Sequence, residues 1–213
     1  MRMRKRKNLE SRLESCKKVT LSADEKINVS EAFGNDNPLQ LEIGCGKGAF
    51  TLEIAKRNPD INFIAIEKES NVIVLAMEKI IREEIHNVRF ICCNADKLTA
   101  LFDEASIDLI YLNFSCPFPK NRHAKHRLTH KNFLDLYRII LMPGHEIHFK
   151  TDNRAFFEFS LNSFCDNDWK LKNITLDLHN SPFNDDNIVT EYEERFSAQG
   201  YPIYRLEAVK PEA

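Results

Sequence analysis

The sequence lacks any apolar run close to the eighteen or so residues that a membrane-spanning helix requires. Its start, MRMRKRKNLE, also lacks the apolar stretch of a secretory signal. The six cysteines form no zinc-type C-x-x-C pair, and several lie in apolar runs, where a reduced thiol behaves as a small hydrophobic side chain. We therefore expect a cytoplasmic protein that has no membrane contact, disulfide or structural zinc.

Acidic residues are missing from one stretch, residues 120–131, which contains five Lys/Arg and three His. A second basic stretch, residues 1–20, has eight Lys/Arg against two Glu, so the remainder of this chain of net charge -2 is clearly acidic. Two basic segments on an acidic protein predict local contact with a polyanion. Each segment alone is equally typical of a solvated tail or loop. The cations that we expect to contact the backbone of this polyanion are Arg4, Lys5, Arg6, Lys7, Arg122, Lys125 and Arg127.

Hydrophobic patterning predicts a basic, flexible arm over residues 1–21, followed by a single domain over 22–213. The domain begins with a short helix, for which Ser22 and Glu25 have the spacing of a capping box. Five apolar runs with the length of buried strands then alternate with helical segments. The expected strands are 39–43, 61–67, 88–93, 107–113 and 145–151, and the expected helices are 48–58, 70–86, 96–103, 130–141 and 153–165.

Repeated strand-helix units predict an α/β fold with a doubly wound, mostly parallel sheet. Two further alternating segments, 169–178 and 202–209, bring the number of strands to seven and predict an antiparallel end to the sheet. Ligands of such sheets bind beyond the carboxyl ends of the strands, so the residues that follow each strand are the candidate site.

The first strand is followed by a glycine turn, LEIGCGKG, whose backbone lets a ligand approach without meeting a Cβ atom. Gly44 and Gly46 lie in this turn, Glu42 precedes it, and Glu67 ends the second strand. A carboxylate at Glu67 can accept both hydroxyls of a ribose, although a solvated charge at a strand end has the same appearance.

Two cofactors fit this turn. Gly44, Gly46 and Ala49 also satisfy the G-x-G-x-x-G/A pattern of nicotinamide enzymes. Glu42 would repel a pyrophosphate and attract a sulfonium, which favours S-adenosylmethionine. Asn94, after the third strand, can bind an adenine edge or simply begin a turn.

The fourth strand ends in LNFSCPFPKNRHAKHR, where two prolines forbid continuation of the strand and Phe118 offers a flat apolar face. An aromatic ring beside a basic cluster suits a flipped-out nucleobase and its phosphates. The three histidines of the cluster lack a nearby carboxylate or cysteine to complete a ligand set, so we expect no metal.

Four segments together resemble the bacterial tRNA (guanine-N7-)-methyltransferases: EIGCGKG, YLNFSCPFPKNRHAKHRLTH, PGHEIHFKTDN and VTEYEERFSAQGYPIYRLE. The resemblance implies a class I, Rossmann-like methyltransferase that moves a methyl group from S-adenosylmethionine to N7 of a guanosine in the variable loop of tRNA. It implies no obligate protein partner. The cofactor contacts that it implies are Glu42, Gly44, Gly46, Glu67, Asn94 and Cys116. The implied substrate contacts are Lys120, Asp152, Thr190, Glu191, Tyr192 and Glu193.

Three positions depart from the family pattern: Cys116 replaces an aspartate, Phe118 a tryptophan and His145 a glycine. The aspartate position has a catalytic and binding role, and loss of one charge-assisted contact costs about 1.5 to 3 kcal/mol. We expect a slower but active enzyme. The alternative is a tRNA-binding protein that is catalytically weakened or inactive.

Several implied contacts also have structural explanations. Thr190 and Glu193 have the spacing of a capping box, and Asp152 could cap the helix that follows it. We therefore expect capping for Thr190 and Glu193, together with substrate contact for Glu191 and Tyr192.

Overall fold

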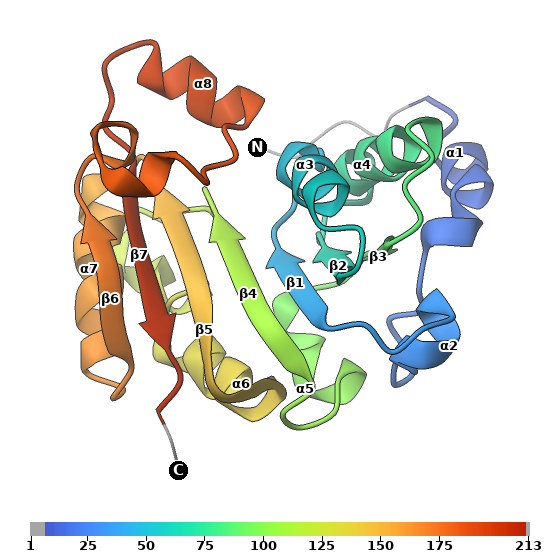
Figure 1. Ribbon diagram of the computed structural model, residues 1–213, viewed down its shortest axis with the longest axis horizontal. Helices are drawn as coiled ribbons and strands as arrows, with labels where there is room; N and C mark the ends of the chain where they lie inside the picture. The colour runs from blue at the N-terminus through green and yellow to red at the C-terminus, as the bar shows by residue number, and fades with distance from the viewer. Residues whose placement is uncertain (1–6, 212–213) are drawn as a thin grey trace. The chain divides into compact units, whose positions relative to one another are not determined.

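The computed structural model describes residues 7–211, so Arg4, Lys5 and Arg6 lie outside the described residues. The chain divides into an N-terminal unit, Met1–Phe102, and a C-terminal unit, Asp103–Ala213, which are described in turn (Figure 1). Within residues 7–211, no helix has the length and apolar character needed to cross a membrane.

The N-terminal unit contains three parallel strands in the order β3-β2-β1. They are β1 (Leu39–Ile43), β2 (Asn62–Ile66) and β3 (Val88–Ile91), and each agrees with a predicted strand to within two residues. Every residue of β2 is buried, as expected for a parallel strand covered on both faces. Helices α3 (Ala49–Arg57) and α4 (Ser70–Arg82) connect the strands and pack against β2 and β3.

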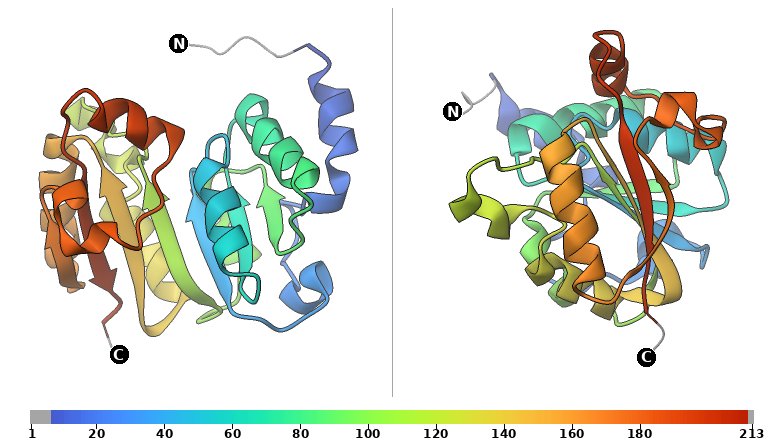
Figure 2. Two further views of the ribbon diagram at one scale, coloured as in Figure 1. Left: turned by 45° about the horizontal axis from the view of Figure 1, so that its top comes forward. Right: turned by 90° about the vertical axis from the view of Figure 1, so that its left-hand side faces the viewer.

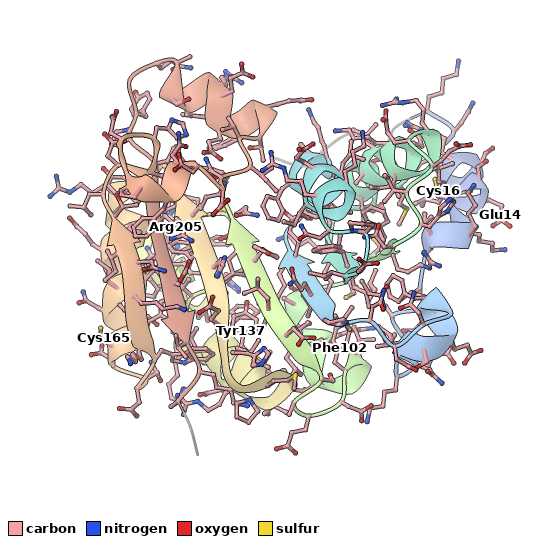
Figure 3. The ribbon with its side chains drawn as sticks, viewed as in Figure 1. Glu14, Cys16, Phe102, Tyr137, Cys165 and Arg205 are labelled. Carbon is pink, nitrogen blue, oxygen red and sulfur yellow. The ribbon has the colours of Figure 1, made fainter. Side chains whose placement is uncertain are left out.

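The expected flexible arm is partly helical. Helix α1 (Leu9–Ser15) and the 3₁₀ turn η1 (Lys17–Val19) pack against α4 and β3. Arg12 forms a bidentate ion pair with Glu78 of α4 at 2.6 Å, and Cys16, labelled in Figure 3, is buried. This helix could not be predicted because the basic segment has few apolar residues and so short a helix is stabilised by packing rather than by helix propensity. The boundary of the arm at residue 21 stays a prediction.

The first helix of the predicted domain begins later than expected. Helix α2 (Val29–Phe33) is capped by Asn28, whose side chain accepts a hydrogen bond from the Glu31 amide. The Ser22 hydroxyl instead accepts from the Asp24 amide in a turn. The capping-box prediction for Ser22 and Glu25 is therefore wrong, because Ser in a short turn competes with the helical arrangement. The unit ends with η2 (Ala95–Lys97) and α5 (Leu98–Leu101).

The C-terminal unit contains four strands in the order β4-β5-β7-β6. They are β4 (Ile107–Asn113), β5 (Leu141–Thr151), β6 (Lys170–Thr175) and β7 (Tyr204–Val209). Strand β4 is parallel to β5, whereas β7 is antiparallel to both β5 and β6, and this confirms the predicted antiparallel last strand. Residues 7–211 thus contain the seven strands expected.

Two long helices pack on the C-terminal sheet (Figure 2). They are α6 (Lys131–Ile140) and α7 (Arg154–Cys165). Phe149 of β5 packs edge-on against Phe156 and parallel to Phe157, both on α7. The short elements of this unit are η3 (Asn121–His126), η4 (Leu178–Asn180), η5 (Pro182–Asn184) and α8 (Glu191–Ser197).

Strand β5 starts at Leu141, four residues before the expected start. Its register against β4 shifts between the pairs Ile107↔Leu141 and Leu109↔Glu146, so the segment that contains Gly144 bulges out of the ladder. His145, which departs from the family pattern, lies in this bulge with Nδ1 2.8 Å from the Asp108 carbonyl.

Candidate functional site

The glycine turn after β1 folds onto the end of β2, because the Gly44 and Cys45 amides both donate to the Ile66 carbonyl. Gly44, Gly46 and Gly48 all have positive φ, a region that suits glycine. A Cβ atom on Gly46 would meet nothing within 4 Å, whereas one on Gly48 would lie 2.6 Å from the Ala76 Cβ atom. Gly46 therefore leaves its backbone open to a ligand, and Gly48 allows α3 to approach α4.

Glu67 lies beside the glycine turn. Its carboxylate accepts hydrogen bonds from the Gly46 amide at 3.3 Å and the Glu69 amide at 3.0 Å. The side chain is half-buried. A carboxylate has about four acceptor positions, so two bonds fix its orientation and leave capacity for the hydroxyls of a ligand.

Glu42 is buried below the turn and accepts a hydrogen bond from the Thr51 hydroxyl of α3. Burial raises the pKa of the neighbouring Cys45 thiol well above its ordinary value, and the negative charges of Glu42 and Glu67 raise it further. The turn therefore lies in a negative potential. Such a potential favours a cationic ligand and opposes a pyrophosphate, as predicted.

Asn94 is exposed and starts η2, where its side-chain oxygen accepts from the Ala95 amide and its NH₂ group donates to Asp96. Asn94 therefore begins a turn, which is one of the two roles expected for it. An adenine contact from Asn94 stays a prediction.

In the C-terminal unit, α8 lies above the carboxyl ends of β4 and β5 (Figure 1). Tyr192 of α8 contacts the residue that follows each strand: its ring lies 5.1 Å from that of Phe114, and its hydroxyl lies 3.4 Å from an Asp152 carboxylate oxygen. Burial raises the pKa of Tyr192, and the negative charge of Asp152 raises it further. Glu191 and Tyr192 are exposed, and substrate contact by both stays a prediction.

A buried ion pair fixes the position of α8. The Lys150 ammonium donates to Glu193, to the side-chain oxygen of Asn187 and to the Ile188 carbonyl, at 2.8 to 3.1 Å. Glu193 is fully buried and also contacts His179 and Asn187. Burial alone would raise the pKa of Glu193, but the charge of Lys150 and the three side-chain hydrogen bonds lower it. Lys150 was missed in the sequence, although a lysine in the buried run HFKT was an available signal.

The capping-box prediction for α8 is half correct. Thr190 caps the helix by accepting from the Glu193 amide at 3.1 Å, but the Glu193 carboxylate faces Lys150 rather than the Thr190 amide. Because Glu193 is fully buried and Thr190 nearly so, both side chains position α8, and this burial weighs against the direct substrate contact that the resemblance implies. Asn153 caps α7, which removes the capping explanation for Asp152.

The basic loop after β4 contains two kinds of cation. Lys120, Arg122 and Lys125 are exposed and form no ion pair with the residues that the structure describes. Arg127 is buried, donates to the Pro117 and Phe118 carbonyls, and lies over the Phe159 ring of α7. The Arg127 guanidinium therefore holds the loop together, and this structural role weighs against the phosphate contact expected of it.

Cys116 is exposed and follows β4 by three residues, at the same strand end as Phe114. The departure from the family pattern at Cys116 thus lies at the carboxyl end of β4. Two residues further on, Phe118 has a positive φ of 40° and its ring lies 5.7 Å from that of His126.

Known proteins that are similar to this chain identify its family. The family model described as "Putative methyltransferase" matches residues 36–206. A tRNA (guanine-N(7)-)-methyltransferase of Streptococcus equi subsp. zooepidemicus is 47% identical over 210 residues, which cover 98% of this chain and 99% of the relative. The chain belongs to the tRNA (guanine-N(7)-)-methyltransferase family. A family member from Brevibacillus brevis is 52% identical over 183 residues, 86% of each chain.

The solved 16S rRNA methyltransferase KamB matches with a TM-score of 0.64 at 12% identity, covering 88% of this chain and 95% of that chain. This match confirms the predicted class I methyltransferase fold. The named members of the tRNA (guanine-N(7)-)-methyltransferase family are enzymes, and no finding supports the alternative of a binding protein without turnover.

Proposed function

We propose that this chain is an enzyme that transfers a methyl group from S-adenosylmethionine to N7 of a guanosine in the variable loop of tRNA. The similarity to named tRNA (guanine-N(7)-)-methyltransferases over nearly the whole length of the chain carries the proposal. The expected compartment is the cytoplasm. The expected partner is tRNA, and no membrane or obligate protein partner is part of the proposal.

The glycine turn fits S-adenosylmethionine. When bound, the cofactor supplies a methyl group on a positively charged sulfonium. Gly44 and Gly46 would admit the ligand to the backbone, and the oriented Glu67 carboxylate would accept ribose hydroxyls. Glu42 and Glu67 would stabilise positive charge, since they already give the turn a negative potential.

The C-terminal unit would hold the guanosine. Guanine N7 has an exposed lone pair, so no proton must be removed before attack, and correct positioning can supply about 7 to 11 kcal/mol of the barrier. Asp152 and Glu191 offer carboxylates to the N–H groups of the base, and Tyr192 offers a ring on which it can stack. Because the purine becomes cationic as the methyl group arrives, a carboxylate near it stabilises the transition state.

Lys120, Arg122 and Lys125 would bind phosphates, because they are exposed and unpaired among the described residues. Lys7 is also exposed and continues this role in the N-terminal segment. Each phosphate contact contributes about 0.7 to 0.9 to the slope of log affinity against log salt.

Substitution of Cys116 tests whether a negative charge at this position promotes methyl transfer. A carboxylate at this exposed position would add one charge-assisted contact, worth about 1.5 to 3 kcal/mol. We expect Cys116→Asp to raise kcat/KM for tRNA by roughly ten- to a hundredfold, with Cys116→Asn as the uncharged control. An equal gain in both variants would show that negative charge at this position has no role.

The experiment for the function as a whole uses the wild-type chain. Methyl-labelled S-adenosylmethionine is incubated with unmodified tRNA, which is then digested to nucleosides. Label in 7-methylguanosine supports the proposal. Label in another nucleoside, or cofactor binding without any labelled nucleoside, refutes it.

A further inference from the structure

Four aromatic rings form a continuous strip on the surface of the C-terminal unit. Phe114 follows β4, Tyr192 and Phe196 lie on α8, and Tyr201 follows α8. Successive ring centroids lie 5.1, 4.5 and 6.0 Å apart. Tyr192 is 45% exposed and Tyr201 is 53% exposed, whereas Phe114 and Phe196 are half-buried, so the two tyrosines give the strip most of its access to solvent.

Local geometry holds the strip in place. Tyr192 and Phe196 are four residues apart and share one face of α8. Gly200 then adopts a φ of 81°, and the Tyr201 amide donates to the Phe196 carbonyl, which folds Tyr201 back onto Phe196. The buried Lys150–Glu193 pair fixes the helix that carries two of the rings. The rings are therefore preorganised for a ligand.

Exposed aromatic side chains that adjoin one another typically mark an interaction site. We propose that Phe196 and Tyr201 stack against unpaired nucleobases that adjoin the target guanosine. This inference rests on the proposed function, since Tyr192, the second ring of the strip, has its hydroxyl beside Asp152 at the end of β5. A strand of RNA that leaves this point along α8 meets Phe196 and Tyr201 next.

The charges on α8 favour bases over phosphates as the occupants. Glu191 and Glu194 are exposed and anionic, and the exposed cation of the helix, Arg195, has its guanidinium 6.0 Å from the centre of the Phe196 ring. Carboxylates repel phosphates but accept hydrogen bonds from base N–H groups. Arg195 can extend the stacking surface through cation–π contact. The strip thus differs from the basic loop, whose cations suit the RNA backbone.

The test compares Tyr201→Leu, which keeps an apolar side chain but removes the π face, with Tyr201→Trp, which restores it. Stacking on a base contributes about 1 to 3 kcal/mol, so Tyr201→Leu should weaken tRNA affinity roughly 5- to 150-fold. Tyr201→Trp should remain within about threefold of wild type. The control is Leu176→Ala, at a side chain that is 63% exposed outside the strip, and it should bind tRNA as wild type does.

Salt dependence separates stacking from phosphate binding. The slope of log affinity against log salt should be unchanged in Tyr201→Leu, whereas Arg122→Ala should reduce its magnitude by about 0.7 to 0.9. Thermal unfolding of each variant checks that the fold is intact.

Three results would overturn the inference: wild-type affinity in Tyr201→Leu, equal losses in the Leu and Trp variants, or a flattened salt slope in Tyr201→Leu. Failure of the wild-type chain to methylate tRNA is a different outcome, because it refutes the proposed function itself.

Discussion

The buried ion pair between Lys150 and Glu193 predicts a large and cooperative loss of stability when either partner is removed. The two side chains are 7% and 0% exposed, and their charged atoms lie 2.8 Å apart. Lys150→Met leaves the Glu193 carboxylate buried with only His179 and Asn187 as partners, and Glu193→Gln leaves the ammonium buried without a counter-charge. Removing one member of a buried pair costs about 3 to 5 kcal/mol.

The double variant Lys150→Met/Glu193→Gln leaves no buried charge. Its cost should therefore be smaller than the sum of the two single costs, by about 2 to 3 kcal/mol. The assay is urea unfolding at pH 7 followed by circular dichroism, with hydrogen exchange at the amides of α8 as a local readout. Exchange should accelerate most at Glu193, whose amide donates to Thr190.

An exposed ion pair supplies the matched control. Lys131 and Asp135 are 61% and 48% exposed and lie one turn apart on α6. Their neutralisation, as Lys131→Met and Asp135→Asn, should change stability by no more than about 0.5 kcal/mol. If Lys150→Met costs less than about 1 kcal/mol, or if the double variant shows no coupling, the network does not hold α8 and the argument for its positioning role fails.

Three further predictions concern other parts of the chain. The pKa of Glu146 is lowered from 4.5 to about 2, mainly by the hydrogen bond from His148, so this carboxylate should stabilise the fold above pH 4.5 and lose that contribution as the pH falls from 4.5 toward 2. Glu146→Gln should abolish this acid-sensitive part of the urea midpoint. A pH profile identical to that of wild type would contradict the prediction. Arg127→Ala should lower the melting temperature and leave the salt slope of tRNA binding intact. Arg122→Ala should leave the melting temperature intact and reduce the salt slope. Swapped effects would refute a structural role for Arg127 and phosphate binding by Arg122. Gly48→Ala should lower the free energy of unfolding by several kcal/mol because its Cβ atom would overlap Ala76, and Gly46→Ala should lower it by about 1 kcal/mol. Urea unfolding measures both, and equal costs would contradict close packing of α3 on α4 at Gly48.

Glu146 belongs to a polar network on the C-terminal sheet. His148 lies between Glu146 and Glu207, and Lys172 pairs with both carboxylates. Arg205, labelled on β7 in Figure 3, also pairs with Glu207. The hydrogen bond with His148, followed by the one with Lys172, lowers the pKa of Glu146 even though burial opposes ionisation.

Strand positions could be predicted because buried parallel strands are short apolar runs between polar turns. The run NFIAI became β2 with every residue buried, and IDLIYLN became β4 over the predicted residues. Helix starts were less predictable. Asn28 rather than Ser22 caps the first helix of the domain, because the Ser22 hydroxyl is engaged in a local turn with the Asp24 amide.

The site could be predicted at the level of strand ends. Glu67 follows β2 in the N-terminal unit and Asp152 follows β5 in the C-terminal unit, as the apolar runs before them indicated, and their roles in ligand binding stay predictions. The roles of Arg127 and Glu193 could not be predicted, because a charged residue gives no sign of burial until its partner is known. In both cases that partner is distant in sequence: Phe159 for Arg127 and Lys150 for Glu193.

The most direct measurement compares two tRNAs that differ in one atom group at the target guanosine. One carries guanosine, and the other carries 7-deazaguanosine, in which a C–H group replaces N7. We expect rapid transfer of labelled methyl to the first tRNA and none to the second, and the protein should bind both tRNAs with similar affinity. Equal methylation of the two tRNAs would contradict attack by N7 and with it the proposed reaction.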